Sequence, residues 1–126
     1  MNNTITATST LPYKTNLFDL SLLEEMDDSA YLLEMLGDVL TETPKDLKEM
    51  QDAMKEAMIE TVGAKAHKLK SSAAIIQAAD LITLFEKIEI AAKKNFPFAE
   101  ITVLVEQALV EYSKVEIALK IYIAQV

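Results

Sequence analysis

The sequence predicts an all-α fold: an antiparallel (up-down-up-down) four-helix bundle with a short extra N-terminal helix. From Leu17 onward, apolar residues recur at steps of three and four, the period of a helix buried on one side. Only two glycines and three prolines occur among 126 residues, fewer than a multi-turn β architecture needs. Short polar breaks between the long periodic stretches are typical of antiparallel neighbouring helices.

The chain is expected to divide into an arm and one domain. Residues 1–16 are rich in Thr, Asn and Ser and have no helical period, so they are expected to form a flexible N-terminal arm. Residues 17–126 are expected to form the bundle. A chain of this length buries roughly two-thirds of its unfolded surface, enough for a core without disulfides.

The first two helices are expected on either side of a polar break at residues 27–29. The first is short, and Asp19 or Ser21 can cap its N-terminus. Pro44 interrupts the second, because proline removes a backbone hydrogen bond and clashes with the preceding turn; this helix either kinks there or divides into two. The core positions expected in these helices are Phe18, Leu22, Leu23, Met26, Tyr31, Met35, Val39, Leu40, Leu47, Met50 and Met54.

Three more helices follow. The third begins near Ile59, and the fourth begins with Asp80 as its cap. Residues 95–97 separate the fourth from the fifth, which covers about 98–122. Residues 101–105 alone would suit a β-strand, but the helical period on both sides outweighs that reading. The core positions expected here are Val62, Ala66, Leu69, Ala73, Ile76, Leu81, Leu84, Phe85, Ile88, Ala92, Ile101, Leu104, Val105, Ala108, Tyr112, Val115 and Leu119.

Composition excludes several kinds of site. The chain has no cysteine, which rules out a disulfide framework, a thiolate zinc site and a cysteine nucleophile. Its only histidine is His67, so one chain cannot supply a two-histidine metal site. We therefore expect no metal or cofactor bound by this chain.

Charge and hydropathy argue against two classes of partner, nucleic acids and membranes. All twelve basic residues are lysine and the net charge is −8, which argues against a nucleic-acid partner. No apolar run approaches the roughly 20 residues of a membrane span. The N-terminal residues lack the features of a signal peptide. The expectation is a cytoplasmic protein, monomeric and not associated with a membrane.

The position of His67 on the third helix directs the functional analysis. At about 100° per residue, His67 lies about 140° from the centre of the apolar stripe, so it projects toward water or a partner. Its neighbours on the helix surface are mostly small, so an approaching protein can reach the ring. The partner-docking surface expected around it comprises Gly63, Ala64, Lys68, Ser71, Ser72 and Ala74.

An exposed imidazole of this kind suits phosphoryl acceptance. Its ordinary pKa near 6.5 leaves a free lone pair at neutral pH. Lys70, one turn away, can neutralise part of the incoming negative charge, and Ser71 or Ser72 can donate a hydrogen bond. Glu89, at the edge where the third and fourth helices would meet, is the candidate for holding the second ring nitrogen protonated.

Three stretches of the sequence resemble a known family. Residues 66–73, Ala-His-Lys-Leu-Lys-Ser-Ser-Ala, followed by Leu81 and by Ile88-Glu89, are similar to the histidine-containing phosphotransfer (HPt) domain of multistep two-component phosphorelays. Residues 17–23 resemble that family's opening segment. Residues 36–47 resemble its kinked second helix. The resemblance covers about residues 17–95.

The resemblance implies a phosphocarrier without autonomous kinase activity. His67 would be the phosphorylated residue, Lys70 its charge partner and Glu89 the carboxylate that orients the ring. The partners would be response-regulator receiver domains, a hybrid histidine kinase, or both, with Mg²⁺ on the receiver. At two positions, Ser71 and Gln77, the family often has glycine, and Gln77 bears on how the third helix ends.

Other interpretations of the same residues stay open. The bundle could be a non-catalytic adaptor that binds or sequesters a signalling partner through the same surface. Glu89 could form an i,i+4 ion pair with Lys93 instead of orienting His67. A hydrolase using His67 with Ser71 is disfavoured, since no oxyanion hole is evident. The acidic residues at 24–28 are expected to be a solvated helix end.

Overall fold

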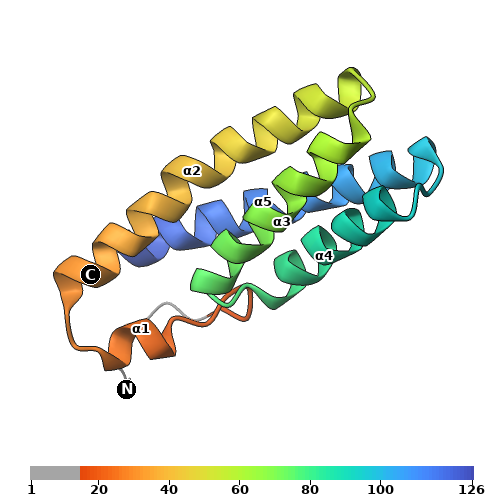
Figure 1. The fold of residues 1–126 in the computed structure, drawn as a ribbon. Helices are drawn as coiled ribbons and strands as arrows, with labels where there is room; N and C mark the ends of the chain where they lie inside the picture. Colours follow the sequence, from red (N-terminus) through yellow and green to blue (C-terminus); the bar gives the residue numbers. More distant parts are fainter. Residues whose placement is uncertain (1–14) are drawn as a thin grey trace.

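The computed structural model describes residues 15–126, and Figure 1 shows their arrangement. The helices are α1 (Ser21–Glu25), α2 (Ser29–Lys55), α3 (Ile59–Ile75), α4 (Ala79–Lys93) and α5 (Phe98–Ala124). The four long helices alternate in direction, each packs against the next, and α5 packs back against α2. The predicted four-helix bundle with a short extra helix is confirmed. Of the predicted arm, residues 1–14 lie outside the described part.

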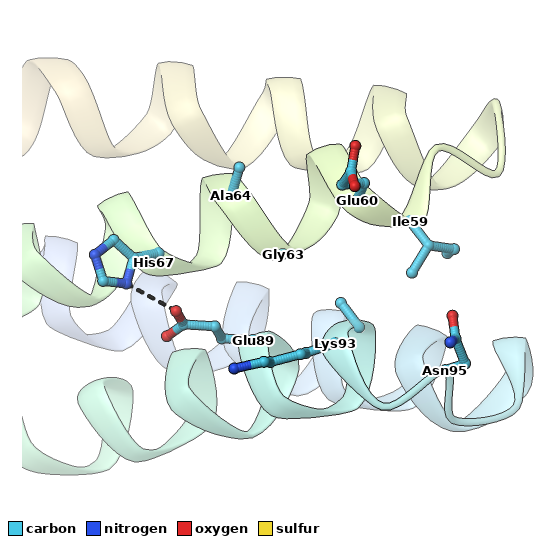
Figure 2. Close-up of a pocket in the computed structure, with 9 residues that line it drawn as sticks. Ile59, Glu60, Gly63, Ala64, His67, Glu89, Lys93 and Asn95 are labelled. Carbon is cyan, nitrogen blue, oxygen red and sulfur yellow. Dashed lines mark hydrogen bonds and ion pairs between the residues drawn. The ribbon is translucent and has the colours of Figure 1, made fainter.

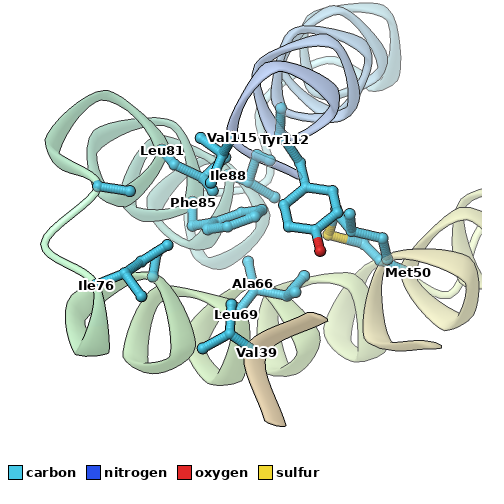
Figure 3. Close-up of a cluster of buried hydrophobic side chains, with 14 of the residues drawn as sticks. Val39, Met50, Ala66, Leu69, Ile76, Leu81, Phe85, Ile88, Tyr112 and Val115 are labelled. Atoms are coloured by element: carbon cyan, nitrogen blue, oxygen red, sulfur yellow. The ribbon is translucent and has the colours of Figure 1, made fainter. Parts of the chain in front are cut away.

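The apolar stripe of α3 faces the centre of the bundle, as Figure 3 shows. Ala66 and Leu69 are fully buried against Phe85 of α4 and Tyr112 of α5. Burying one large apolar side chain contributes about 1.5–3 kcal/mol, so this stripe fixes the rotation of α3 firmly. All five core positions predicted for α3 are buried, which leaves the opposite side of the helix, with His67, outside the core.

The predicted core positions of the first helix are partly wrong. Leu22 and Met26 are exposed, whereas Phe18 and Leu20, which precede the helix, are buried. A helix of five residues is too short to bury an apolar stripe. The chain before it packs on the end of the bundle instead, where the Asp19 N–H donates to the Ile76 carbonyl at 3.0 Å. Of the two predicted caps, Asp19 accepts the Ser21 N–H.

At the start of α2, the buried positions are shifted by one residue from those predicted. Tyr31 is exposed and Met35 half-buried, while their neighbours Leu32 and Leu36 are buried. The Asp28 side chain caps the helix by accepting the Tyr31 N–H, which sets where the first turn begins. Apolar residues at 31 and 35, and again at 32 and 36, give this helix two possible buried sides. Packing against the rest of the bundle buries the second pair.

The division of α2 at Pro44 is wrong, since one helix runs from Ser29 to Lys55 with the proline inside it. Proline inside a helix removes one backbone hydrogen bond and its ring crowds the preceding turn, at a cost of about 3 kcal/mol. Buried residues on both sides of it, Val39 and Leu47, hold the two halves against the same core. Tertiary packing therefore outweighs the local cost.

The boundaries of α4 and α5 are close to those predicted. Asp80 is not the cap of α4: the N-cap residue is Ala78, without a side-chain hydrogen bond, and Asp80 lies in the first turn. A carboxylate there still interacts favourably with the helix dipole. Residues 101–105 are helical, so the strand alternative is wrong. No helix within residues 15–126 combines the length and the apolar character that crossing a membrane requires.

Gln77 adopts a backbone conformation that glycine prefers. Its φ is 48°, in the left-handed region, and the N–H of the next residue, Ala78, donates back to the Ala73 carbonyl at 3.1 Å. This closes α3 in the way a glycine after a helix usually does. Asp27, Ala57 and Asn95 have left-handed φ values in the other three links between helices.

Gln77→Gly is therefore expected to stabilise the protein by about 1 kcal/mol, because a side chain is disfavoured in the left-handed region. The midpoint of urea unfolding should rise with no change in the m-value. The matched control is Gln107→Gly in an exposed helix interior, which should lower stability by about 1 kcal/mol. Equal effects of the two substitutions would contradict the conformational argument.

Candidate functional site

His67 stands on the outer side of α3, near the middle of the helix. Its side chain is 64% exposed, whereas Ala66 before it is fully buried. The core stripe of α3 causes this difference, because residues one position apart on a helix point about 100° apart. The predicted outward projection of the imidazole is confirmed.

Glu89 of α4 links His67 to Lys70 across the α3–α4 interface. One carboxylate oxygen, Oε2, lies 2.8 Å from His67 Nδ1, the pair joined by the dashed line in Figure 2. The other, Oε1, accepts a hydrogen bond from Lys70 Nζ at 3.0 Å. A carboxylate on Nδ1 keeps the proton there, so the lone pair is on Nε2. Figure 2 shows this second ring nitrogen on the side away from Glu89.

The charge state of Glu89 supports this arrangement. The hydrogen bond from Lys70 lowers the pKa of the Glu89 carboxyl, burial opposes that shift, and the hydrogen bond with His67 adds to the lowering. Glu89 is therefore ionised at neutral pH and accepts from both partners. Among the described residues its ion pairs are those with His67 and Lys70, and not the i,i+4 pair with Lys93.

A groove of about 720 Å³ lies beside His67 between α3 and α4. Two predicted docking residues, Gly63 and Ala64, form part of it. Lys93 also lines it, and Figure 2 shows this side chain running alongside Glu89. Sequence reasoning missed five of the groove residues, although the spacing of Lys93, one turn after Glu89, was a usable signal. The missed residues are Ile59, Glu60, Ala92, Lys93 and Asn95.

Gly63 allows α3 and α4 to approach closely. A Cβ atom added there would lie 3.1 Å from the Ala92 Cβ, a contact that the helices could relieve only by moving apart. Gly37, in contrast, has nothing within 4 Å of an added Cβ. The small residue at position 63 thus brings Glu89 within reach of His67.

Gly63→Ala is expected to destabilise the protein by roughly 1 kcal/mol, since overpacking outweighs the gain in helix propensity. The matched control Gly37→Ala replaces a half-buried helix glycine where an added Cβ meets nothing, and it should stabilise by about 0.5–1 kcal/mol. Chemical unfolding of both variants measures the difference. Stabilisation by both substitutions would show that the α3–α4 contact is not tight.

The other predicted docking residues occupy the surface around His67 in different ways. Lys68 is exposed but its Nζ donates to Asp46 of α2 at 3.1 Å. The Ser71 hydroxyl donates to the His67 backbone carbonyl at 3.4 Å. Ser72 is half-buried and Ala74 is exposed. Ala74 and Ser71 therefore leave the approach to the ring open, as predicted.

Asp46 is a residue that the sequence analysis missed. Its carboxylate is fully buried on α2, with Lys68 at 3.1 Å and Lys65 at 3.8 Å. A buried carboxylate needs a positive partner, so these contacts tie α3 to α2 on the side of His67 away from Glu89. The signal was present, because Asp46 falls within the apolar side of α2 next to Leu47.

The acidic residues at 24–28 do not gather into a metal site. Within residues 15–126 no three potential ligands among His, Cys, Asp and Glu cluster together. Glu24 instead accepts a hydrogen bond from the Tyr122 hydroxyl at 2.6 Å, which ties α1 to the end of α5.

Comparisons with known proteins agree with this geometry. The family model described as Hpt domain matches residues 34–125. The structure is similar to the crystal structure of the HPT domain from the Hpt sensor hybrid histidine kinase of Shewanella, with a TM-score of 0.75 and 25% sequence identity over 88% of this chain and 97% of that chain. None of the curated proteins matches the chain. Hpt domains are phosphocarriers and not kinases. The chain belongs to the Hpt domain family and thus to the phosphotransfer proteins of two-component phosphorelays.

Proposed function

We propose that this Hpt domain is a relay intermediate that accepts a phosphoryl group on His67 from the aspartyl phosphate of one receiver domain and passes it to another. One observation carries the proposal. The imidazole is exposed, and its Nδ1 is held by an ionised carboxylate, so Nε2 is a free nucleophile facing the partner.

The phosphoryl transfer needs no proton acceptor, because the attacking nitrogen carries no proton. The Nε2 lone pair attacks phosphorus, the bond from phosphorus to the aspartyl oxygen breaks, and the aspartate leaves as a carboxylate. The ring keeps its Nδ1 proton and gains positive charge, which the Glu89 carboxylate at 2.8 Å stabilises. Transfer to the second receiver is the reverse step on another aspartate.

Lysines around His67 favour the arriving phosphoryl group although the chain as a whole is acidic. Lys70 lies one turn from His67 and is held there by Glu89, and Lys93 lines the adjacent groove. An ammonium group near the transferring oxygens lowers the energy of the transition state. Mg²⁺ is expected on the receiver domain.

We further propose that the domain works in the cytoplasm. Its partner proteins are response-regulator receiver domains, a hybrid histidine kinase, or both. The domain has no kinase activity of its own in this proposal. The alternative, a non-catalytic adaptor, would use the same open surface for binding alone.

The test starts from receiver domains carrying radiolabelled aspartyl phosphate. We expect a cognate receiver to label the chain, the label to be acid-labile and base-stable, and a second receiver to remove it. Two results would contradict the proposal: a panel of receivers that never labels the chain, or a label with another stability. Receiver binding without any label would identify the adaptor.

A further inference from the structure

The outer side of α5 is apolar where a bundle helix normally meets water. Val103, Val110 and Ile117 are 51%, 60% and 62% exposed, and Ile121 is 39% exposed. The first three are spaced seven residues apart, which places them in one line opposite the buried side of the helix. Exposed apolar side chains repeated every two turns along one side of a helix, with charged residues between them, are typical of a helix that pairs with another helix.

The stripe is symmetric about Val110. Val103 and Ile117 lie seven residues before and after it. The residues four positions before and after it, Glu106 and Lys114, carry opposite charges. An antiparallel second α5, with its two-fold axis at Val110, places Val103 of one copy against Ile117 of the other. It also brings Glu106 to the level of Lys114 of the second copy. A parallel pair would set like charges against each other.

A groove at one end of the stripe lies where the antiparallel arrangement puts the other end of the second copy's stripe. It has a volume of about 590 Å³ and lies between α4 and the first half of α5. The same two-fold axis brings Ile117 and Ile121 of the second copy to the levels of Val103 and Ala99, which both line this groove. The full lining is Lys87, Ile90, Phe96, Ala99, Glu100, Val103, Leu104 and Gln107.

We propose that a second copy of this chain docks on α5 in this antiparallel arrangement, in place of the monomer expected from the sequence. The helix α3 packs on α2 and α4, and α5 packs on the same two helices, so α3 and α5 occupy opposite corners of the bundle. Both His67 side chains therefore stay accessible in the dimer. One helix and one groove per copy form a small interface, so the dimer is weak and depends on concentration.

Cysteine cross-linking tests the geometry directly, because the natural chain has no cysteine. Val110→Cys should form an intermolecular disulfide readily, since the two copies of this position meet at the axis. Ile117→Cys, on the same side of α5 and equally exposed, is the matched control. Its two copies would lie about 21 Å apart along the helices at 1.5 Å per residue, so it should cross-link only when mixed with Val103→Cys. Equal self-cross-linking of the two variants, or none in either, would overturn the proposal.

Sedimentation equilibrium tests the energetics. The wild-type mass should rise toward that of a dimer with concentration, and Val110→Lys should weaken the dimer roughly tenfold or more by burying two ammonium groups at the axis. Leu33→Lys, exposed on α2, is the control and should leave the dimer intact. Glu106→Lys and Lys114→Glu should each weaken self-association, and mixing these two variants should restore it. A monomer at every concentration, or no restoration on mixing, would contradict the antiparallel dimer.

Discussion

His67→Gln is expected to abolish phosphorylation of the chain by phosphorylated receiver domains. Glutamine retains a polar side chain of similar length, but it has no nucleophilic nitrogen with a free lone pair. The residual label should fall at least about 10³-fold, to the background of the assay. Radiolabel transfer from a receiver measures the loss.

The fold and the docking surface should survive this substitution. The His67 side chain is 64% exposed and makes no core contact, so the melting temperature should change little. Receiver affinity should stay within a few-fold of wild type. An unchanged transfer rate in His67→Gln would remove His67 from the reaction.

Lys70→Ala is expected to slow phosphoryl transfer by roughly 10²-fold while leaving receiver binding largely intact. The ammonium acts in two ways, by holding Glu89 at 3.0 Å and by neutralising the charge that arrives with the phosphoryl group. Without Lys70, the pKa of Glu89 should rise toward its ordinary value, because the Lys70 hydrogen bond is the main cause of its lowering. The rate and an NMR titration of the Glu89 carboxyl measure the two effects.

The control separates local from overall charge. Lys120→Ala removes the same charge from an exposed position on α5, far along the chain from the site, and should leave both the rate and the Glu89 titration unchanged. A Lys70→Ala variant that transfers at the wild-type rate would contradict the role of Lys70. A slow variant whose Glu89 pKa does not move would restrict that role to the phosphoryl charge.

The fold was most predictable from the sequence where the apolar residues of a helix define one buried side only. In α3, the apolar residues from Val62 to Ile76 all lie on one side of the helix, and their predicted burial is correct. At the start of α2, apolar residues define two overlapping sides, and only contact with the rest of the bundle decides that Leu32 is buried and Tyr31 is not. The helix through Pro44 likewise depends on packing that local rules do not contain.

The sequence also predicted the three residues that meet at the site, His67, Lys70 and Glu89, and the structure brings them together. It could not show which ring nitrogen Glu89 holds, because that depends on the register between α3 and α4. The same register brings Gly63 against Ala92. Asp46 was missed because its importance depends on Lys65 and Lys68, which lie 19 and 22 residues further along the chain on another helix.

The most direct test of the account is the identity of the phosphorylated atom. NMR of the ¹⁵N-histidine-labelled, ³¹P-phosphorylated protein distinguishes a phosphoryl group on Nε2 from one on Nδ1 through its nitrogen–phosphorus coupling. With Nδ1 held by Glu89 at 2.8 Å, the account predicts phosphorylation of His67 at Nε2. A phosphoryl group on Nδ1, or on any residue other than His67, would contradict it.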